Sequence, residues 1–372
     1  MRIVIYPSGH GFGHATRDIE LLNAIGRKRA DARLIMRTGA LPPFIRAGVE
    51  TPFDFQIADT DTGVAQVDSL EVDEEATVRR AGAFYHDFDR RVDAEAAVLR
   101  HLRASVVVGD VPPLAFAAAA RAGVPSVALG NFTWDWIYAV YPLFDELAPD
   151  VLPTIRHAYA AATVALRLPL HGGFEPMQHV VEDVPLIARS ARAGRAEARR
   201  RLGIAGPETV VLASFGRYGA QLPYAAIARE SRFTILLTEH EAPAGTDWTG
   251  HARILWVSEA RLAETGLRYP DLVAAADVVV SKPGYGIVSE CIANGTSLLY
   301  TSRGRFAEYE LFVREMPAML RCRHLSQDDL RGGRWADAIE ALLRQEAPRF
   351  RVDTRGADVA ADRILASAGN GA

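Results

Sequence analysis

The sequence predicts an α/β protein with two doubly wound parallel-sheet domains that face each other across a cleft. Short apolar, β-branched runs alternate with amphipathic helical segments in both halves of the chain, as they do in parallel sheets. A glycine-rich turn follows a strand and opens a helix once in each half, at 8–14 and at 282–286. The length of 372 residues suits two domains better than one.

In the first half, each expected strand is a short run of mainly apolar residues. These runs lie at 2–6, 33–37, 52–57, 105–109, 124–129 and 163–168, and we expect the last of them to end this half. A helix at 15–29 follows the first glycine turn. The charged, amphipathic stretch 72–102 predicts a long helix with a break near Gly82.

A segment without periodicity separates the two halves. Residues 171–190 begin rich in Gly, Pro and His and predict a linker between a domain at 1–170 and a domain at 191–350. We expect a C-terminal helix within 351–372 to pack back on the first domain. The expected strands of the second half lie at 209–213, 233–237, 252–257, 277–280, 297–300 and 318–322.

The stretch 277–300 is the most informative part of the sequence. Its strand ends at a turn containing Gly284, and a helix then runs until Gly295 ends it. The unpaired N–H groups at the start of such a helix suit a phosphate. Glu290 lies early in this helix, within reach of ribose hydroxyls on a nucleotide bound at the turn. These residues alone also fit a strand–turn–helix unit that binds no ligand, in which the glycines only allow the tight turn.

Composition narrows the classes of function. With 49% hydrophobic residues and a net charge of −4, the chain has an ordinary soluble composition that argues against nucleic-acid binding. No apolar run approaches the roughly 20 residues of a membrane span, and the first residues enter a strand without a secretory signal pattern, so we expect a cytoplasmic protein. Two cysteines allow no disulfide framework. The basic run 192–201 fits a solvated helix face, with an anionic membrane surface as the alternative. The oligomeric state stays open.

The first glycine turn permits two interpretations. Its spacing is G-x-G-x-G, a poor match to a nicotinamide dinucleotide site, although Arg37 at the end of the second strand would suit NADP. In the other interpretation, His14 at the start of the following helix removes a proton from an acceptor hydroxyl. Asp110, at the end of a neighbouring strand, would orient His14. Each residue also has a purely structural alternative, as a backbone contact for His14 and a helix cap for Asp110.

Several motifs together resemble GT-B nucleotide-sugar glycosyltransferases, in the branch of the lipid-II N-acetylglucosaminyltransferases and plant diglyceride galactosyltransferases. The narrower resemblance is to the glycosyltransferase-like N-terminal region of L-arabinokinases. It rests on GHGFGHATR (9–17), DTGVAQVDSLEVD (61–73), GDVPPLA (109–115), NFTWDWIY (131–138), RLPL (167–170) and KPGYGIVSE (282–290). The kinase domain of those proteins has no counterpart in this sequence, so the resemblance does not imply kinase activity but a glycosyltransferase-like module.

The resemblance implies two Rossmann-like domains and a donor site on the second one. The pyrophosphate would lie on the turn 284–287 and near the turn 215–216, with ribose held by Glu290 and the base read at 256–257. Glu308 and Glu310 stand where the class contacts the donor sugar. The implied donor-binding residues are Gly216, Arg217, Trp256, Val257, Lys282, Gly284, Tyr285, Gly286, Ile287, Glu290, Glu308 and Glu310.

On the first domain, the resemblance implies a catalytic base at His14, partnered by Asp110. The residues expected to contact the acceptor are His10, Gly11, Phe12, Asp61, Asn131 and Trp134, and simple packing is the alternative for the aromatic segment 131–141. We expect no metal ion and no cofactor, because Lys282 or Arg217 can neutralise the leaving diphosphate.

The expected activity is an inverting transfer from a nucleotide diphosphate sugar, with UDP as the expected nucleotide, to a soluble small-molecule acceptor. A nucleotide-sugar 2-epimerase or hydrolase, and a sugar-nucleotide binding module without turnover, are the alternatives.

Overall fold

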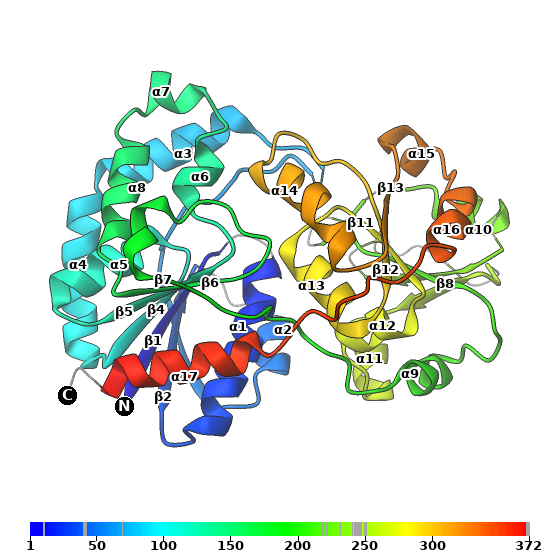
Figure 1. The fold of residues 1–372 in the computed structure, drawn as a ribbon, viewed down its shortest axis with the longest axis horizontal. Helices are drawn as coiled ribbons and strands as arrows, with labels where there is room; N and C mark the ends of the chain where they lie inside the picture. Colours follow the sequence, from blue (N-terminus) through cyan, green and yellow to red (C-terminus); the bar gives the residue numbers. More distant parts are fainter. Residues whose placement is uncertain are drawn as a thin grey trace.

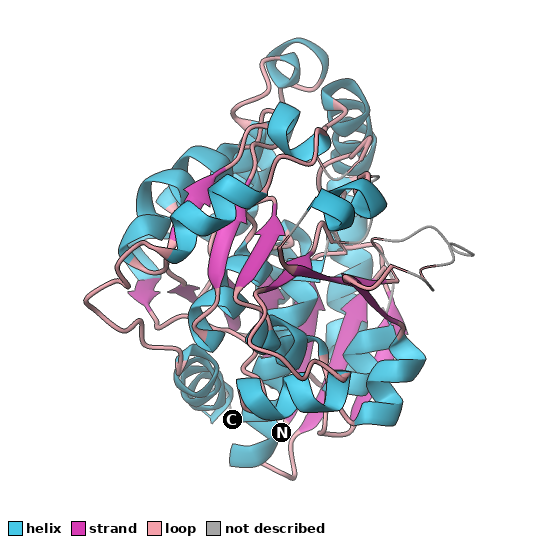
Figure 2. Cartoon of the chain, turned by 90° about the vertical axis from the view of Figure 1, so that its right-hand side faces the viewer, coloured by secondary structure: helices cyan, strands magenta, loops and turns pink. Residues whose placement is uncertain are grey.

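The computed structural model contains two parallel sheets, each flanked by helices (Figures 1 and 2). It describes residues 1–9, 12–39, 43–68, 70–216, 219–220, 222–230, 232–239, 241, 248 and 251–369.

The first sheet has seven strands in the order β3-β2-β1-β4-β5-β6-β7, and every adjacent pair is parallel. Its strands are β1 (Arg2–Pro7), β2 (Arg33–Thr38), β3 (Phe53–Ile57), β4 (Val106–Asp110), β5 (Ser126–Gly130), β6 (Val164–Arg167) and β7 (Val181–Asp183). Its helices are α1 (Phe12–Lys28), α2 (Pro43–Gly48), α3 (Glu74–His86), α4 (Phe88–Leu102), α5 (Pro113–Ala122), α6 (Trp134–Tyr138), α7 (Leu143–Leu147), α8 (Val151–Ala160) and the 3-10 helix η1 (Glu175–Val180).

The second sheet has six parallel strands in the order β10-β9-β8-β11-β12-β13. Its strands are β8 (Val210–Ala213), β9 (Thr234–Thr238), β10 (Ile254–Val257), β11 (Val278–Ser281), β12 (Ser297–Tyr300) and β13 (Cys322–His324). The remaining helices are α9 (Arg195–Leu202), α10 (Tyr224–Glu230), α11 (Glu259–Thr265), α12 (Tyr269–Ala275), α13 (Tyr285–Asn294), α14 (Ala307–Glu315), η2 (Met316–Ala318), α15 (Gln327–Arg331), α16 (Ala336–Leu343) and α17 (Gly356–Gly369).

The order of strands in each sheet reverses next to its glycine turn. In the first sheet, β1 lies between β2 and β4, so the turn after β1 adjoins Asp110 at the end of β4. In the second sheet, β11 pairs with β8, so the turns after these two strands are neighbours. Ligands of doubly wound sheets bind at such reversal points, at the carboxyl ends of the strands.

Three sequence expectations about elements differ from the structure. The helix at 72–102 is two helices, and the break lies at Asp87, which ends α3 and begins α4. Part of the expected linker forms β7, an edge strand of the first sheet. This polar strand pairs with β6, and its Asp183 forms an ion pair with Arg167. The last strand is β13, displaced from 318–322 because Pro317 lies in the 3-10 turn of η2.

The C-terminal helix α17 lies against α1 of the first domain (Figure 1). Two exposed ion pairs join these helices, Arg27 with Asp358 and Lys28 with Asp362. The chain therefore passes from the first domain to the second and returns, so that two segments connect the domains.

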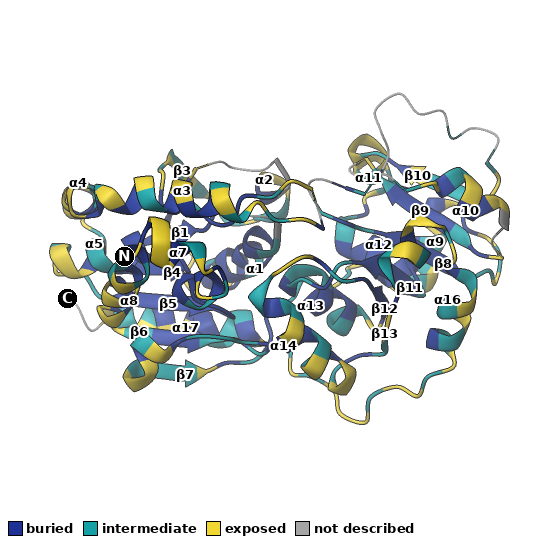
Figure 3. Ribbon diagram, turned by 90° about the horizontal axis from the view of Figure 1, so that it is seen from above, coloured by how far each residue is buried: buried dark blue, intermediate teal, exposed yellow. Residues whose placement is uncertain are grey.

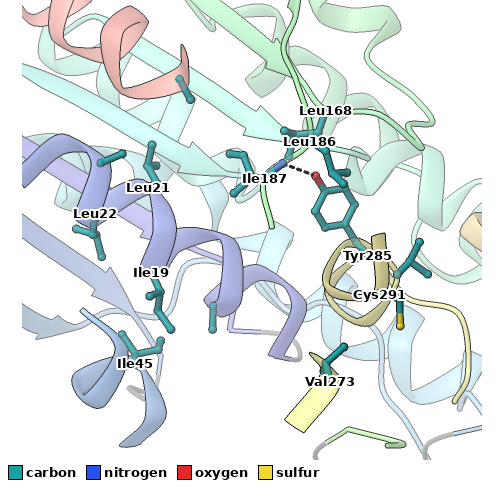
Figure 4. Packing of buried hydrophobic residues seen from close by; sticks show 14 of the residues in the cluster. Ile19, Leu21, Leu22, Ile45, Leu168, Leu186, Ile187, Val273, Tyr285 and Cys291 are labelled. Carbon is teal, nitrogen blue, oxygen red and sulfur yellow. Dashed lines mark hydrogen bonds between the residues drawn. The ribbon is translucent and has the colours of Figure 1, made fainter. Parts of the chain in front are cut away.

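The hydrophobic core continues across the junction of the domains. Tyr285 of α13 packs near Leu168, Leu186 and Ile187, and its hydroxyl accepts a hydrogen bond from the backbone N–H of Ile187 at 3.3 Å (Figure 4). The inner strands of both sheets are buried, whereas the edge strands β3, β7, β10 and β13 are only partly buried and the outer faces of the helices are exposed (Figure 3). The shared core holds the two glycine turns at a defined separation.

Candidate functional site

A cavity of about 830 Å³ lies between the domains, and both glycine turns line it. The first turn contributes Gly13 and His14, and the second contributes residues 284–287. The carboxyl ends of both sheets therefore share one cavity, as the sequence analysis expected from the placement of these turns.

The two glycine turns touch each other directly. A Cβ added to Gly286 would lie 3.2 Å from the Cα of Gly13 and 3.3 Å from the hydroxyl oxygen of Thr16. Both distances are tighter than ordinary van der Waals contact, so glycine at position 286 permits the close approach of α1 and α13.

His14 and Asp110 lie together on the first-domain side of the cavity. The Nδ1 atom of His14 is 2.9 Å from Oδ1 of Asp110, and His14 lines the cavity whereas Asp110 is completely buried behind it. Burial raises the pKa of Asp110, but the charges of Arg17 and His14 outweigh burial and bring it to about 2. When Nδ1 donates its proton to this carboxylate, Nε2 is an acceptor that can take a proton.

Arg17 connects this pair to the rest of the site, and the sequence analysis assigned it no role. Its Nε atom donates to Oδ2 of Asp110 at 2.7 Å, and one terminal nitrogen donates to Oδ1. The other terminal nitrogen donates to Oδ1 of Asn131 at 2.8 Å, and the guanidinium carbon lies 5.2 Å from the centroid of the Tyr285 ring. The signal was available, because Arg17 follows His14 by three positions in one helix and thus shares its face.

Asn131 links the two domains through Glu308. Its amide nitrogen donates to Oε1 of Glu308 at 2.7 Å, and Glu308 is 5% exposed. Burial raises the pKa of Glu308, while Asn131 and the nearby positive charges oppose that shift. A continuous hydrogen-bonded chain thus runs from Glu308 of the second domain to His14 of the first. Glu310, expected beside Glu308, is exposed on α14 and does not line the cavity.

The start of α13 presents backbone to the cavity. Gly284 precedes the helix, no side chain caps the helix start, and residues 284–287 line the cavity. This backbone can bind an anion through its N–H groups and the positive end of the helix dipole. The side chain of Tyr285 instead packs at the domain junction, as described above.

Glu290 is paired with Arg189, another residue without a role in the sequence analysis. The Nε atom of Arg189 donates to Oε1 of Glu290 at 2.7 Å, and both residues line the cavity. Burial raises the pKa of Glu290, and the charge and hydrogen bond of Arg189 lower it. Arg189 lies in the segment between the domains, and the sequence offers no pattern from which its contact with the distant Glu290 could be predicted.

The turn at 215–216 is already engaged by a carboxylate. Glu241 accepts hydrogen bonds from the backbone N–H of Phe215 and from that of Ala220, the latter at 3.1 Å. Burial raises the pKa of Glu241 to about 7. Gly216 lines the cavity, but these two N–H groups serve Glu241 rather than an incoming phosphate.

Two cationic side chains, Lys282 and Arg303, also line the cavity. Arg303 is 8% exposed, and its guanidinium carbon lies 3.7 Å from the centroid of the Phe306 ring. Burial and then the charge of Arg303 lower the pKa of Lys282 to about 7.

The expected acceptor and base-binding residues are only partly brought together. Asn131 and Trp134 line the cavity, whereas Asp61 is buried behind them and accepts from the Trp134 indole at 2.9 Å. Val257 lines the cavity, but Trp256 does not and is 38% exposed. His10, Gly11 and Arg217 lie outside the described residues, and Phe12 is described only as the first residue of α1.

Two features are absent from the described part of the chain. No three His, Cys, Asp or Glu side chains in these ranges are grouped to hold a metal ion. None of the described helices is both long enough and apolar enough to cross a bilayer.

No family model matches this sequence. L-arabinokinase of Arabidopsis thaliana is 31% identical over 371 aligned residues, which cover 96% of this chain and 33% of that protein. The chain therefore spans about a third of the length of the relative that it matches. This similarity agrees with the resemblance noted in the motifs.

Solved structures show the fold. The glycotransferase of kitacinnamycin superposes with a TM-score of 0.65 at 17% identity, covering 98% of both chains. The calicheamicin glycosyltransferase CalG4 gives 0.62 at 18% identity, covering 99% of this chain and 98% of that one. Phytolacca americana UGT2, solved with UDP-2-fluoro-glucose and pterostilbene, has a TM-score of 0.58 at 15% identity. The superposition covers 100% of this chain and 94% of that one. By fold this chain is a GT-B protein, and by sequence it is a relative of L-arabinokinase.

Proposed function

We propose that this protein is an inverting glycosyltransferase that moves a sugar from a UDP-linked nucleotide sugar to a hydroxyl group of a small soluble acceptor. One observation carries the proposal. The uncapped start of α13, which suits a diphosphate, and the His14–Asp110 pair, which suits a hydroxyl proton, line or adjoin one cavity. Donor phosphate and acceptor hydroxyl would then meet with the anomeric carbon between them.

The chemistry would be a single displacement. Nε2 of His14 takes the acceptor proton while the acceptor oxygen bonds to the anomeric carbon, and the bond from that carbon to the diphosphate oxygen breaks. The electron pair leaves on UDP, whose growing negative charge the N–H groups at 284–287 and Lys282 stabilise. Asp110 holds the His14 imidazole and stabilises its protonated form. No resident metal ion or cofactor has a part in this scheme.

The proposed substrates draw on the fold neighbours. Phytolacca americana UGT2 was solved with a UDP-sugar analogue and pterostilbene, which supports a UDP donor and a small acceptor here. Glu290, held by Arg189, would accept from the ribose hydroxyls, and the strand end at Val257 would meet the base. Trp134 and Phe132 would form part of an aromatic acceptor wall.

The test is His14→Ala, assayed for UDP release from UDP-sugars with a panel of hydroxyl acceptors. We expect turnover to fall by at least about a hundredfold, the scale of general base catalysis. UDP affinity measured by calorimetry should stay unchanged. His101→Ala, at an exposed histidine of α4, is the matched control and should retain full turnover. Full turnover in His14→Ala would refute the assigned base.

A 2-epimerase or hydrolase is favoured by one observation, the buried carboxyl of Glu308 in the same cavity. Such enzymes need acid and base groups beside the sugar. The two activities separate without an acceptor, because an epimerase or hydrolase alters UDP-N-acetylglucosamine alone, whereas the proposed transferase leaves it intact.

A binding module without turnover is favoured by the alignment with L-arabinokinase, since the matched third belongs to a longer protein. Such a module would bind UDP-sugars in calorimetry and yet form no product with any acceptor of the panel.

A further inference from the structure

Lys282 is a half-buried cation and Arg303 a buried one, and no described residue neutralises either charge directly. Within the described ranges, neither the Lys282 ammonium nor the Arg303 guanidinium forms an ion pair or a side-chain hydrogen bond. The recorded contact of the Arg303 guanidinium is with the face of the Phe306 ring, at 3.7 Å. Both side chains line the cavity.

Nearby carboxylates do not resolve this excess of positive charge. Glu241 and Glu308 act on Lys282 from a distance, as does Asp68, but Glu241 is bonded to two backbone N–H groups and Glu308 to Asn131. Glu308 and the Tyr141 hydroxyl are the groups that favour the charged form of Arg303, against its burial. Charge that is removed from water without a bonded partner is costly, so these two side chains favour an anionic ligand.

The neighbours of the two cations belong to the donor part of the site for Lys282 and to the acceptor part for Arg303. Lys282 immediately precedes the turn of α13, where the diphosphate is proposed to bind. Arg303 stacks on Phe306, which packs against the first-domain aromatic cluster that contains Phe132 and Trp134. Glu308 of the same loop and helix reaches His14 through the hydrogen-bonded chain described above. The pair would therefore span from the proposed diphosphate site to the proposed acceptor wall, where the transferred sugar and the reacting end of the acceptor would lie.

We infer that Lys282 and Arg303 form an anion subsite at the point of transfer, which binds a carboxylate or phosphate group of the transferred sugar or of the acceptor. The inference rests on the proposed function and adds a substrate class to it: a uronic-acid sugar nucleotide, or a sugar acid or sugar phosphate as acceptor. A guanidinium held flat against a ring offers a planar pair of donors, which matches a carboxylate better than a neutral hydroxyl.

The test compares UDP, UDP-glucose and UDP-glucuronate by calorimetry, with the wild-type protein and Arg303→Gln. If the sugar carries the anion, the wild type should bind UDP-glucuronate about tenfold or more tighter than UDP-glucose. Arg303→Gln should remove this preference and leave UDP affinity unchanged. Arg314→Gln, at an exposed arginine of α14, is the matched control and should keep the preference.

A second arm addresses the acceptor as the source of the anion. With UDP saturating, glucuronate and glucose 6-phosphate are compared with glucose as second ligands. A preference for the charged sugars that disappears in Arg303→Gln supports the subsite with an anionic acceptor.

The outcomes that overturn the inference differ from those that overturn the proposed function. The subsite is refuted if the wild type prefers the charged ligand in neither arm. It is also refuted if Arg303→Gln loses as much affinity for UDP as for UDP-glucuronate. Both outcomes leave the transferase proposal standing. Failure of the wild type to bind UDP refutes both. Without ligand, Arg303→Gln should melt no lower than the wild type, because it removes an uncompensated buried charge. If it does not fold, Lys282→Gln decides: the ratio of its affinities for UDP-glucuronate and UDP-glucose should fall to about one, in addition to the loss of UDP affinity expected from its role at the diphosphate.

Discussion

At the scale of single residues, the site depends on side chains whose partners come from distant parts of the chain. Arg17 binds Asp110 and Asn131 and faces the ring of Tyr285. Because its charge compensates Asp110, the carboxylate remains ionised at any ordinary pH, which agrees with a pKa of about 2. The role of Arg17 is therefore to position the His14–Asp110 pair rather than to react.

Lys282 gives a prediction about pH. Its pKa is about 7, and a bound diphosphate would raise it, so binding at pH 8 would take up a proton. UDP affinity should then fall as pH rises above 7, by up to about tenfold per pH unit. Calorimetry in buffers of different ionisation enthalpy measures the proton uptake directly.

Lys282→Gln is the variant that isolates this group. Its UDP affinity should be weaker and nearly independent of pH between 7 and 9. Glu241, whose pKa is about 7, titrates in the same range, and Asp68, Glu308 and Arg303 also act on Lys282. Proton uptake that persists in Lys282→Gln would assign the effect to Glu241 and contradict the prediction.

At the scale of elements, the contact between α1 and α13 depends on glycine. An alanine at position 286 would force Gly13 and Thr16 to shift by a few tenths of an ångström. An alanine at position 284 would stand in open space, and the backbone there is extended, with φ of −154°. Two glycines of one turn therefore have separable roles.

We expect Gly286→Ala to lower the free energy of unfolding by about 1–2 kcal/mol, the usual cost of overpacking, less a small gain in helix propensity. Gly284→Ala should melt close to the wild type and yet lose UDP binding, because its methyl group would occupy the proposed phosphate site. Thermal unfolding with and without UDP measures both effects. Equal melting of the two variants would contradict the assigned contact.

At the scale of the whole molecule, α17 ties the end of the chain to the first domain. A Cβ on Gly356 would lie 2.1 Å from the carbonyl oxygen of Pro185 and 2.8 Å from Cγ1 of Ile187. Both of those residues lie in the other connection between the domains. The close approach at Gly356 thus joins the two segments that connect the domains.

Gly356→Ala should therefore destabilise the protein by about 1–3 kcal/mol and increase hydrogen exchange in α17 and in the segment 184–190. Gly369→Ala, at the last residue of the same helix where an added Cβ meets nothing within 4 Å, is the control. Unfolding in urea and hydrogen exchange supply the measurements. An unchanged exchange rate at 184–190 in Gly356→Ala would show that the two segments are not coupled.

The sequence by itself determined the alternation of strands and helices, the two glycine turns and the two doubly wound domains, because hydrophobic period and glycine act locally. The GT-B class came from the resemblance of its motifs to known glycosyltransferases. It also placed His14 and Asp110 at neighbouring strand ends, since the order of parallel strands brings such ends together. The edge strands β7 and β13 carry no apolar run. The sequence therefore predicted a linker at β7 and placed the last strand a few residues before β13. Only the tertiary structure decided which charges meet: Arg17 with Asp110, Arg189 with Glu290, and Lys282 near Arg303. These contacts join residues far apart in the chain or on separate loops, and no local pattern in a sequence encodes the closure of two domains.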